Sequence, residues 1–155
     1  MKHAFSTLIL FVLSVLAVSA QDQTLRVDYI FSGTDKATEI SLGRLYSFDG
    51  WAGRTVNLDS VPVKGNGQIS MTDIATGKGI YMQSFSTLFQ QWKTTEEATK
   101  VRKAFENTFL LPMPSVKAEV KIELYGFKGG VSASMTHEVD PADILIRQIL
   151  EEFMA

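Results

Sequence analysis

The chain of 155 residues contains no cysteine. Without cysteine it cannot form disulfides and cannot carry a lipid on an N-terminal cysteine. Histidine is almost as scarce, because only His3 and His137 are present. Since zinc sites are built mainly from Cys and His side chains, we expect the chain to hold no zinc and no cofactor.

A long run of charge of one sign is also missing. The sequence has 15 basic and 17 acidic residues, which gives a formal net charge of -2 at pH 7. Proteins that bind nucleic acid or anionic membrane surfaces usually carry a basic excess or a basic patch. We therefore expect neither nucleic acid nor a membrane as the partner of the processed protein.

The one long apolar run lies at the N-terminus and predicts export. Lys2 precedes an apolar stretch at 8–18, and small residues at 18–20 precede the polar Gln21. This order is typical of a secretory signal peptide, and the run is shorter than the roughly 20 residues that span a bilayer. We expect residues 1–20 to be removed and residues 21–155 to form a single domain in the periplasm or outside the cell.

Alternation of apolar and polar residues is the dominant pattern in the rest of the chain. It is clearest in "LRVDYIF" (25–31) and "VKAEVKIELY" (116–125), and it predicts strands with one buried and one solvated face. Glycines in "GFKGG" and "TGKG" predict hairpins over 116–139 and 67–85. A further strand is expected over 38–45, where the alternation fades toward "LYSFDG". We predict a mainly β fold, an antiparallel β-sandwich.

The middle of the chain predicts a short helical insert, at about residues 86–105. Phe85, Leu88, Phe89 and Trp92 are spaced as one stripe of a helix, which would bury Trp92 in the core. Thr94 and Glu97 have the spacing of a capping box at the start of a second helical turn. The prolines at 112 and 114 indicate that the segment after this insert is an extended edge piece.

His137 and Glu138 resemble half of a zinc-peptidase motif, but the rest of the motif is missing. The H-E-x-x-H motif lies on a helix, and its second histidine would fall at position 141, which is Pro141. On a strand, His137 shares a face with four apolar residues, Val131, Ala133, Met135 and Val139. We interpret His137 as a half-buried structural histidine, and we expect no catalytic residue and no metal ligand in the chain.

A candidate binding surface is predicted around the glycine-rich stretch "DGWAGRT" (49–55). Trp51 stands close to Arg54 and follows Tyr46, and an exposed indole beside an arginine suits a protein or glycan ligand. The alternative is an indole that tucks inward and anchors its loop, because large aromatic side chains are mostly buried. The sequence leaves both interpretations open.

The C-terminal segment predicts a short helix. Asp140 suits the N-cap, Pro141 suits the first helical position, and an apolar stripe follows at Ile146, Ile149, Leu150 and Phe153. Such a helix would cover part of the sheet or leave an apolar patch for a partner domain.

Several ordered segments resemble one known family. They are "LRVDYIFSG", "GWAGRTVNLDSVPVKGNGQISMTD", "IYMQSFSTLFQQW", "FENTFLLPMP" and "THEVDPADILIR". Together they resemble the N-terminal domain of the bacterial IgA-type secreted zinc metallopeptidases. In that family the domain precedes a separate catalytic domain that carries the zinc motif, and the resemblance ends near residue 147.

The resemblance implies a non-enzymatic accessory module. Its expected role is to position a metallopeptidase catalytic domain or the glycoprotein substrate of that domain. The alternative is a free-standing secreted module that binds a glycan or a host protein. A hydrolase with an unrecognised site is a third hypothesis, which no constellation of residues supports. Kinship in fold alone does not establish any of these functions.

Overall fold

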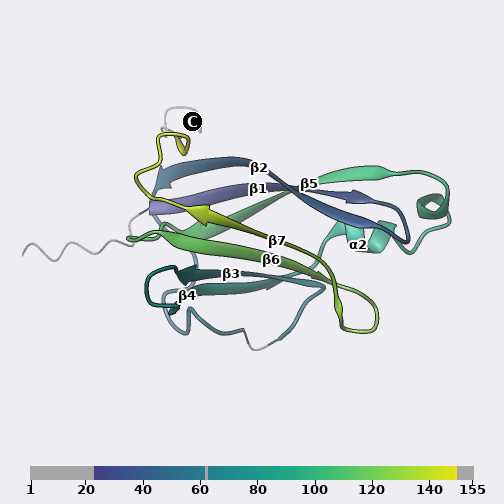
Figure 1. Ribbon diagram of the computed structural model, residues 1–155, viewed down its shortest axis with the longest axis horizontal. Helices are drawn as coiled ribbons and strands as arrows, with labels where there is room; N and C mark the ends of the chain where they lie inside the picture. The colour runs from purple at the N-terminus through teal and green to yellow at the C-terminus, as the bar shows by residue number, and fades with distance from the viewer. Residues whose placement is uncertain (1–22, 62, 150–155) are drawn as a thin grey trace, which may run out of the picture.

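The computed structural model describes residues 23–61 and 63–149, and it forms a sandwich of two four-stranded sheets (Figure 1). The first sheet has the strand order β5-β1-β2-β8. Its antiparallel strands are β1 (Gln23–Gly33), β2 (Thr38–Asp49) and β5 (Lys103–Pro112). The short β8 (Arg147–Gln148) pairs with β2 in parallel. The predicted edge piece is confirmed, because β5 lies at one edge of this sheet.

The second sheet has the order β4-β3-β6-β7 and is antiparallel throughout. Its strands are β3 (Gly67–Asp73), β4 (Gly79–Phe85), β6 (Ala118–Tyr125) and β7 (Val131–Val139). Both predicted hairpins are confirmed as β3–β4 and β6–β7. The predicted fold class, a mainly β antiparallel sandwich, is therefore confirmed.

The core lies between the sheets, where the inward residues of each strand meet. Every second residue of β1 and of β6 is fully buried, as the alternation predicts. An aromatic cluster fills one part of the core around Phe31. The ring of Phe31 lies 6.3 Å from that of Phe85 and 6.4 Å from those of Phe89 and Phe109. These spacings are typical of packed aromatic pairs, which contribute beyond their buried area.

A β-bulge explains why the alternation of β2 fades. Val27 pairs with Leu45, but Tyr29, two residues further, pairs with Leu42. Along β2 the extra residue moves the inward positions from even numbers, up to Leu42, to odd numbers, from Leu45 onward. Gly43 stands in the bulge, where a Cβ atom would lie 2.9 Å from the carbonyl oxygen of Asp28. The strand therefore continues to Asp49, beyond the predicted end at residue 45.

The helical insert is shorter than predicted. It consists of α2 (Leu88–Trp92) and the 3-10 turn η1 (Glu97–Thr99), and the segment from Lys103 onward is strand β5. The capping box does not form, because the Glu97 carboxylate accepts a hydrogen bond from Trp92 Nε1 at 2.8 Å. Long-range pairing with β1 thus overrides the helical spacing. The buried position predicted for Trp92 is confirmed.

The predicted C-terminal helix is wrong within the described residues. Asp140 accepts a hydrogen bond from the backbone N–H of Ala142 at 2.9 Å, but a turn follows and not a helix. The chain then joins β2 through β8, and the N–H of Ile149 donates to the carbonyl of Ser47 at 2.7 Å. Leu150 and Phe153 of the predicted stripe lie outside the described residues, as does the predicted signal peptide.

In the part of the chain that the structure describes, no helix is long and apolar enough to cross a membrane.

Candidate binding groove beside Trp51

His137 is a structural residue, half-buried at the edge of the core. Its Nδ1 donates to the carbonyl of Glu138 at 3.3 Å, which leaves Nε2 to accept from the Tyr29 hydroxyl at 2.6 Å. Burial lowers the pKa of His137, with a smaller opposing effect from the Glu138 carbonyl, and burial raises the pKa of Tyr29. Residues 23–61 and 63–149 bring no three His, Cys, Asp or Glu side chains together as a metal site.

The prediction placed one residue of β7, Val131, on the wrong face of the strand. Ala133 pairs with Leu124, but Val131 pairs with Tyr125, so Ser132 forms a bulge between them. The bulge turns Val131 to the outer face, where its side chain is 54% exposed. The inward face of β7 is thus formed by Ala133, Met135, His137 and Val139.

Lowering the pH should destabilise the fold through His137. Because its pKa is below the ordinary value of 6.5 in the folded state, the unfolded chain binds the proton more readily. The contribution of neutral His137 to stability is therefore full above pH 6.5 and is lost as the pH falls toward the folded pKa. Urea unfolding across this pH range should show the decline, and His137→Gln should remove it. An equal decline in that variant would contradict the assignment to His137.

The predicted binding residues lie on the long connection between β2 and β3, residues 50–66. This connection leaves the first sheet and runs along the outer edge of the second, beside β4. The N–H of Met82 donates to the carbonyl of Leu58 at 2.6 Å, and the Ser84 hydroxyl donates to the carbonyl of Val63 at 2.5 Å. The connection therefore covers the edge of β4 and holds the two sheets together at this side.

The side chain of Arg54 holds the connection against β4. Its Nη1 donates to the carbonyls of Asn57 at 2.8 Å and of Ser60 at 2.9 Å, and its Nη2 donates to the carbonyl of Met82 on β4. The guanidinium also lies over the ring of Tyr81, with Cζ 5.5 Å from the ring centre. The guanidinium therefore contacts both the connection and β4, and these contacts hold the two together.

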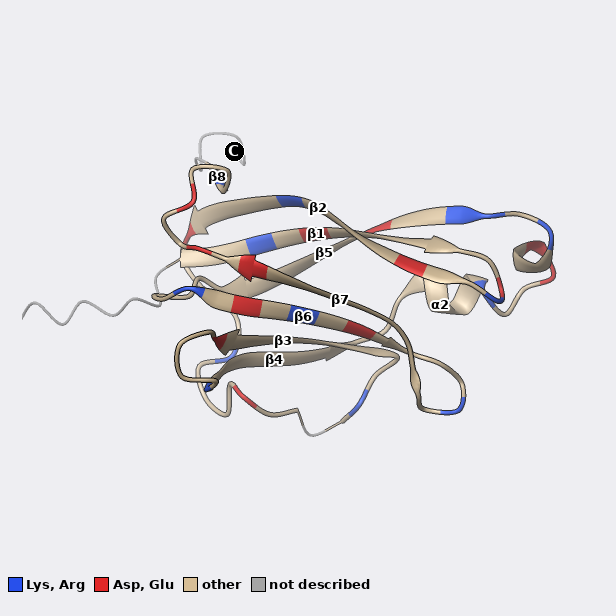
Figure 2. Ribbon diagram, in the orientation of Figure 1, with Lys and Arg blue, Asp and Glu red and all other residues tan. Residues whose placement is uncertain are grey.

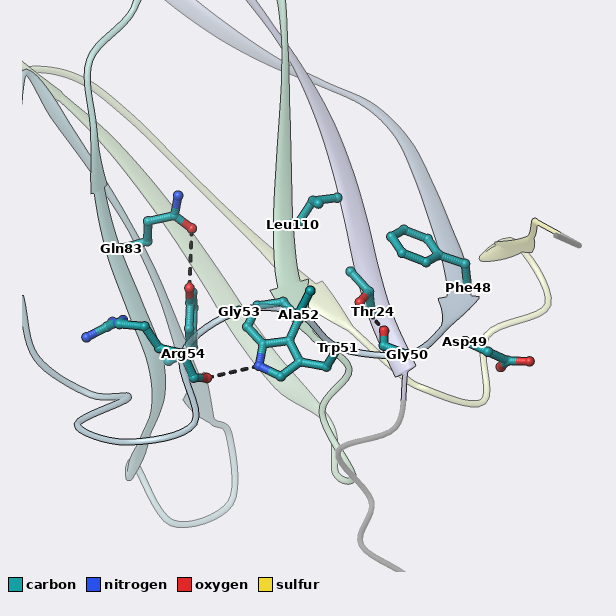
Figure 3. Close-up of a pocket in the computed structure, with 11 residues that line it drawn as sticks. Thr24, Phe48, Asp49, Gly50, Trp51, Ala52, Gly53, Arg54, Gln83 and Leu110 are labelled. Atoms are coloured by element: carbon teal, nitrogen blue, oxygen red, sulfur yellow. Dashed lines mark hydrogen bonds between the residues drawn. The ribbon is translucent and has the colours of Figure 1, made fainter. Parts of the chain in front are cut away.

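Trp51 packs against the second sheet and lines a groove (Figure 3). Its Nε1 donates to the carbonyl of Arg54 at 2.9 Å, and its ring meets that of Tyr81 edge-on at 5.6 Å. Gly53 lies so close to the indole that a Cβ atom would stand 2.0 Å from Cζ2. The contacts are those of an indole that anchors its loop, and its partly exposed surface is available to a ligand.

The groove has a volume of about 730 Å³. Besides the connection it is lined by Thr24, Phe48 and Leu110 of the first sheet and by Gln83 of β4. Leu110 is 46% exposed, an unusual position for a leucine on the solvated face of a sheet. The groove is mainly apolar with a few polar groups, as small-molecule and peptide sites are.

Tyr46 does not join Trp51 and Arg54. It lies on the outer face of the first sheet, in a separate trough. The guanidinium of Arg26 lies over its ring, with Cζ 5.1 Å from the ring centre. Sequence proximity placed these three residues together, but Tyr46 lies on β2, whereas Trp51 and Arg54 lie on the connection that runs beside β4. Phe48, which closely precedes Trp51 in the sequence, does line the groove, whereas Leu110 of β5 was missed, because only its apolar side chain at an outward position marks it.

The Peptidase M64 N-terminus family matches residues 17–136, which is most of the chain. The chain belongs to this family. The match covers the N-terminal domain of these peptidases and does not include their catalytic domain. No curated protein matches the chain significantly. Over most of its length the chain is therefore similar to the domain found at the N-terminus of M64 peptidases.

Proposed function

We propose that this M64 N-terminal domain is a non-catalytic, exported accessory module of an IgA-type metallopeptidase. Its function is to dock on the catalytic domain and to position that domain or its glycoprotein substrate. The docking surface is the end of the sandwich that carries the Trp51 groove. The family match, the absence of a metal cluster in the described residues and the apolar groove support this proposal.

The single observation that carries the proposal is the apolar surface gathered at this end. Ile144 is 93% exposed and Leu145 is 76% exposed, on the turn that leads into β8. β8 pairs with Tyr46 and Ser47, immediately before Phe48, which lines the groove. Exposed aliphatic residues next to an apolar groove are typical of a surface that a partner covers.

Docking can be tested with a pair of charge substitutions. Ile144→Asp with Leu145→Asp should leave the domain folded, because both side chains are exposed, and should abolish its association with an M64 catalytic domain supplied as a separate chain. The matched control is Phe127→Asp with Val131→Asp, two residues that are 89% and 54% exposed. They lie in and after the β6–β7 turn, at the opposite end of the sandwich (Figure 1).

Calorimetry or biolayer interferometry would measure the association, and thermal melts would confirm folding. The proposal expects loss of binding in the first pair and wild-type binding in the control pair. Equal binding by both pairs, or no association of the unaltered domain with the catalytic domain, would overturn the proposal.

A further inference from the structure

The outer face of the first sheet carries a polar trough that the proposed function does not use. It has a volume of about 440 Å³, within the size range of small-molecule sites. Six of the residues that line it have polar side chains on the outer face, and they come from β1, β2 and β5: Arg26, Asp28, Arg44, Tyr46, Glu106 and Thr108. The trough lies over the bulge at Gly43, where a residue without a side chain leaves the surface of the sheet hollow.

Five of the six polar side chains of the trough, all except Glu106, contact one another. Arg26 donates twice to the Asp28 carboxylate, at 2.9 and 3.1 Å, and the Thr108 hydroxyl donates to the same carboxylate at 2.7 Å. Burial opposes the charge of Asp28, but the hydrogen bonds from Arg26 and Thr108 outweigh it and keep its pKa below the ordinary value. A hydrogen bond with Tyr46 raises the pKa of Arg44. A prearranged set of this kind loses little freedom when it binds a ligand.

The chemistry of the trough indicates the class of ligand. Two guanidiniums and two carboxylates balance in charge, so the trough offers no excess positive charge for a phosphate or a nucleic acid. Basic and acidic positions lie near one another along β1 and β2 (Figure 2). Donors, acceptors and one aromatic ring together suit hydroxyl groups, which both donate and accept, on rings that also have apolar faces.

We propose that this trough binds a neutral oligosaccharide. For its biological role the inference rests on the proposed function, since the glycan would belong to the glycoprotein substrate of the peptidase. The trough adjoins the Trp51 groove, because Thr24 and Phe48 of the groove lie two residues from Arg26 and Tyr46 of the trough on the same strands. A glycan bound here lies next to the surface on which the catalytic domain docks.

Two-dimensional NMR of the purified chain tests the proposal, because it reports binding and folding together. The probes are maltotriose, chitotriose and lacto-N-tetraose at millimolar concentration. At least one should give saturable shifts at backbone amides around Arg26, Arg44 and Glu106. Tyr46→Ala should raise the dissociation constant of that oligosaccharide by about tenfold or more, the loss of affinity expected when a stacked, hydrogen-bonding side chain is removed.

The matched control is Tyr125→Ala, a tyrosine paired with Val131 on the outer face of the other sheet. It should leave the dissociation constant unchanged. The absence of shifts with all three oligosaccharides, a dissociation constant that Tyr46→Ala does not change, or equal shifts with an unglycosylated extended peptide would each overturn the proposal. The docking variant at Ile144 and Leu145 should still bind the sugar, so a failure of docking and a failure of glycan binding are distinguishable.

Discussion

Replacing Phe31 by alanine is expected to lower the free energy of unfolding by about 3–5 kcal/mol, the cost of truncating a buried phenylalanine. Phe31 is fully buried on β1 and lies in the centre of an aromatic cluster. Its ring is nearly parallel to that of Phe85, with an interplanar angle of 18°, and it also contacts Phe89 of α2 and Phe109 of β5. The substitution would thus loosen contacts between both sheets and the helical insert.

Phe127→Ala is the matched control for this prediction. It removes the same atoms from a side chain that is 89% exposed in the β6–β7 turn, so the change in stability should stay within about 0.5 kcal/mol. Urea unfolding of the two variants measures both values directly. Similar losses in both would mean that the aromatic cluster around Phe31 is not the core of the sandwich.

The strands could be predicted where a strand has one buried face and an unbroken register. In β1 and β6 every second residue is buried, and the sequence alternates accordingly. Glycines at the turns then predicted the hairpins β3–β4 and β6–β7. The alternation is a direct consequence of burial, so the fold class followed from it without knowledge of the sheet order.

Bulges limited the prediction within the strands. Gly43 in β2 and Ser132 in β7 each add one residue, and the inward face changes parity there. This is why β2 appeared to end early and why Val131 was assigned to the wrong face. A bulge depends on the register of the partner strand, which a single strand's pattern does not contain.

The helical insert was predicted too long, and a helix was predicted wrongly after Asp140, for a related reason. Phe105 fits a helical stripe, but it pairs with Phe31 of β1, 74 positions earlier in the chain, and becomes part of a strand. An Asp-Pro pair such as Asp140 and Pro141 is common at the start of turns as well as of helices. Here a turn forms, because the chain must continue into β8 and pair with β2. The local sequence is compatible with a helix and with a strand or turn, and only pairing with a distant strand, β1 or β2, selects between them.

The candidate site was predictable in part. The neighbourhood of Trp51 and Arg54 was visible in the sequence, because the indole and the guanidinium share a short glycine-rich loop. Arg54 also donates to the carbonyl of Met82, which lies 28 positions further along the chain. The sequence therefore could not show that Arg54 holds the connection against β4. The trough around Tyr46 was likewise hidden, since its members come from three strands.

Arg54→Met should lower the free energy of unfolding by about 1.5–3 kcal/mol, the typical contribution of hydrogen bonds from a charged group. Methionine retains an apolar stem over the Tyr81 ring, but it leaves the carbonyls of Asn57, Ser60 and Met82 without their donor. The indole of Trp51 should move as well, because its Nε1 donates to the carbonyl of Arg54. Tryptophan fluorescence during urea unfolding reports both effects.

Arg54→Lys separates geometry from charge. Lysine keeps the positive charge, but its single ammonium on a flexible stem does not reproduce the planar fork that reaches three carbonyls. We therefore expect Arg54→Lys to show most of the loss seen in Arg54→Met. Arg44→Met, at an exposed arginine of β2, should change stability by less than about 1 kcal/mol. Wild-type stability in Arg54→Lys would show that charge alone holds the connection against β4, and a loss in Arg44→Met as large as that in Arg54→Met would remove any special role for Arg54.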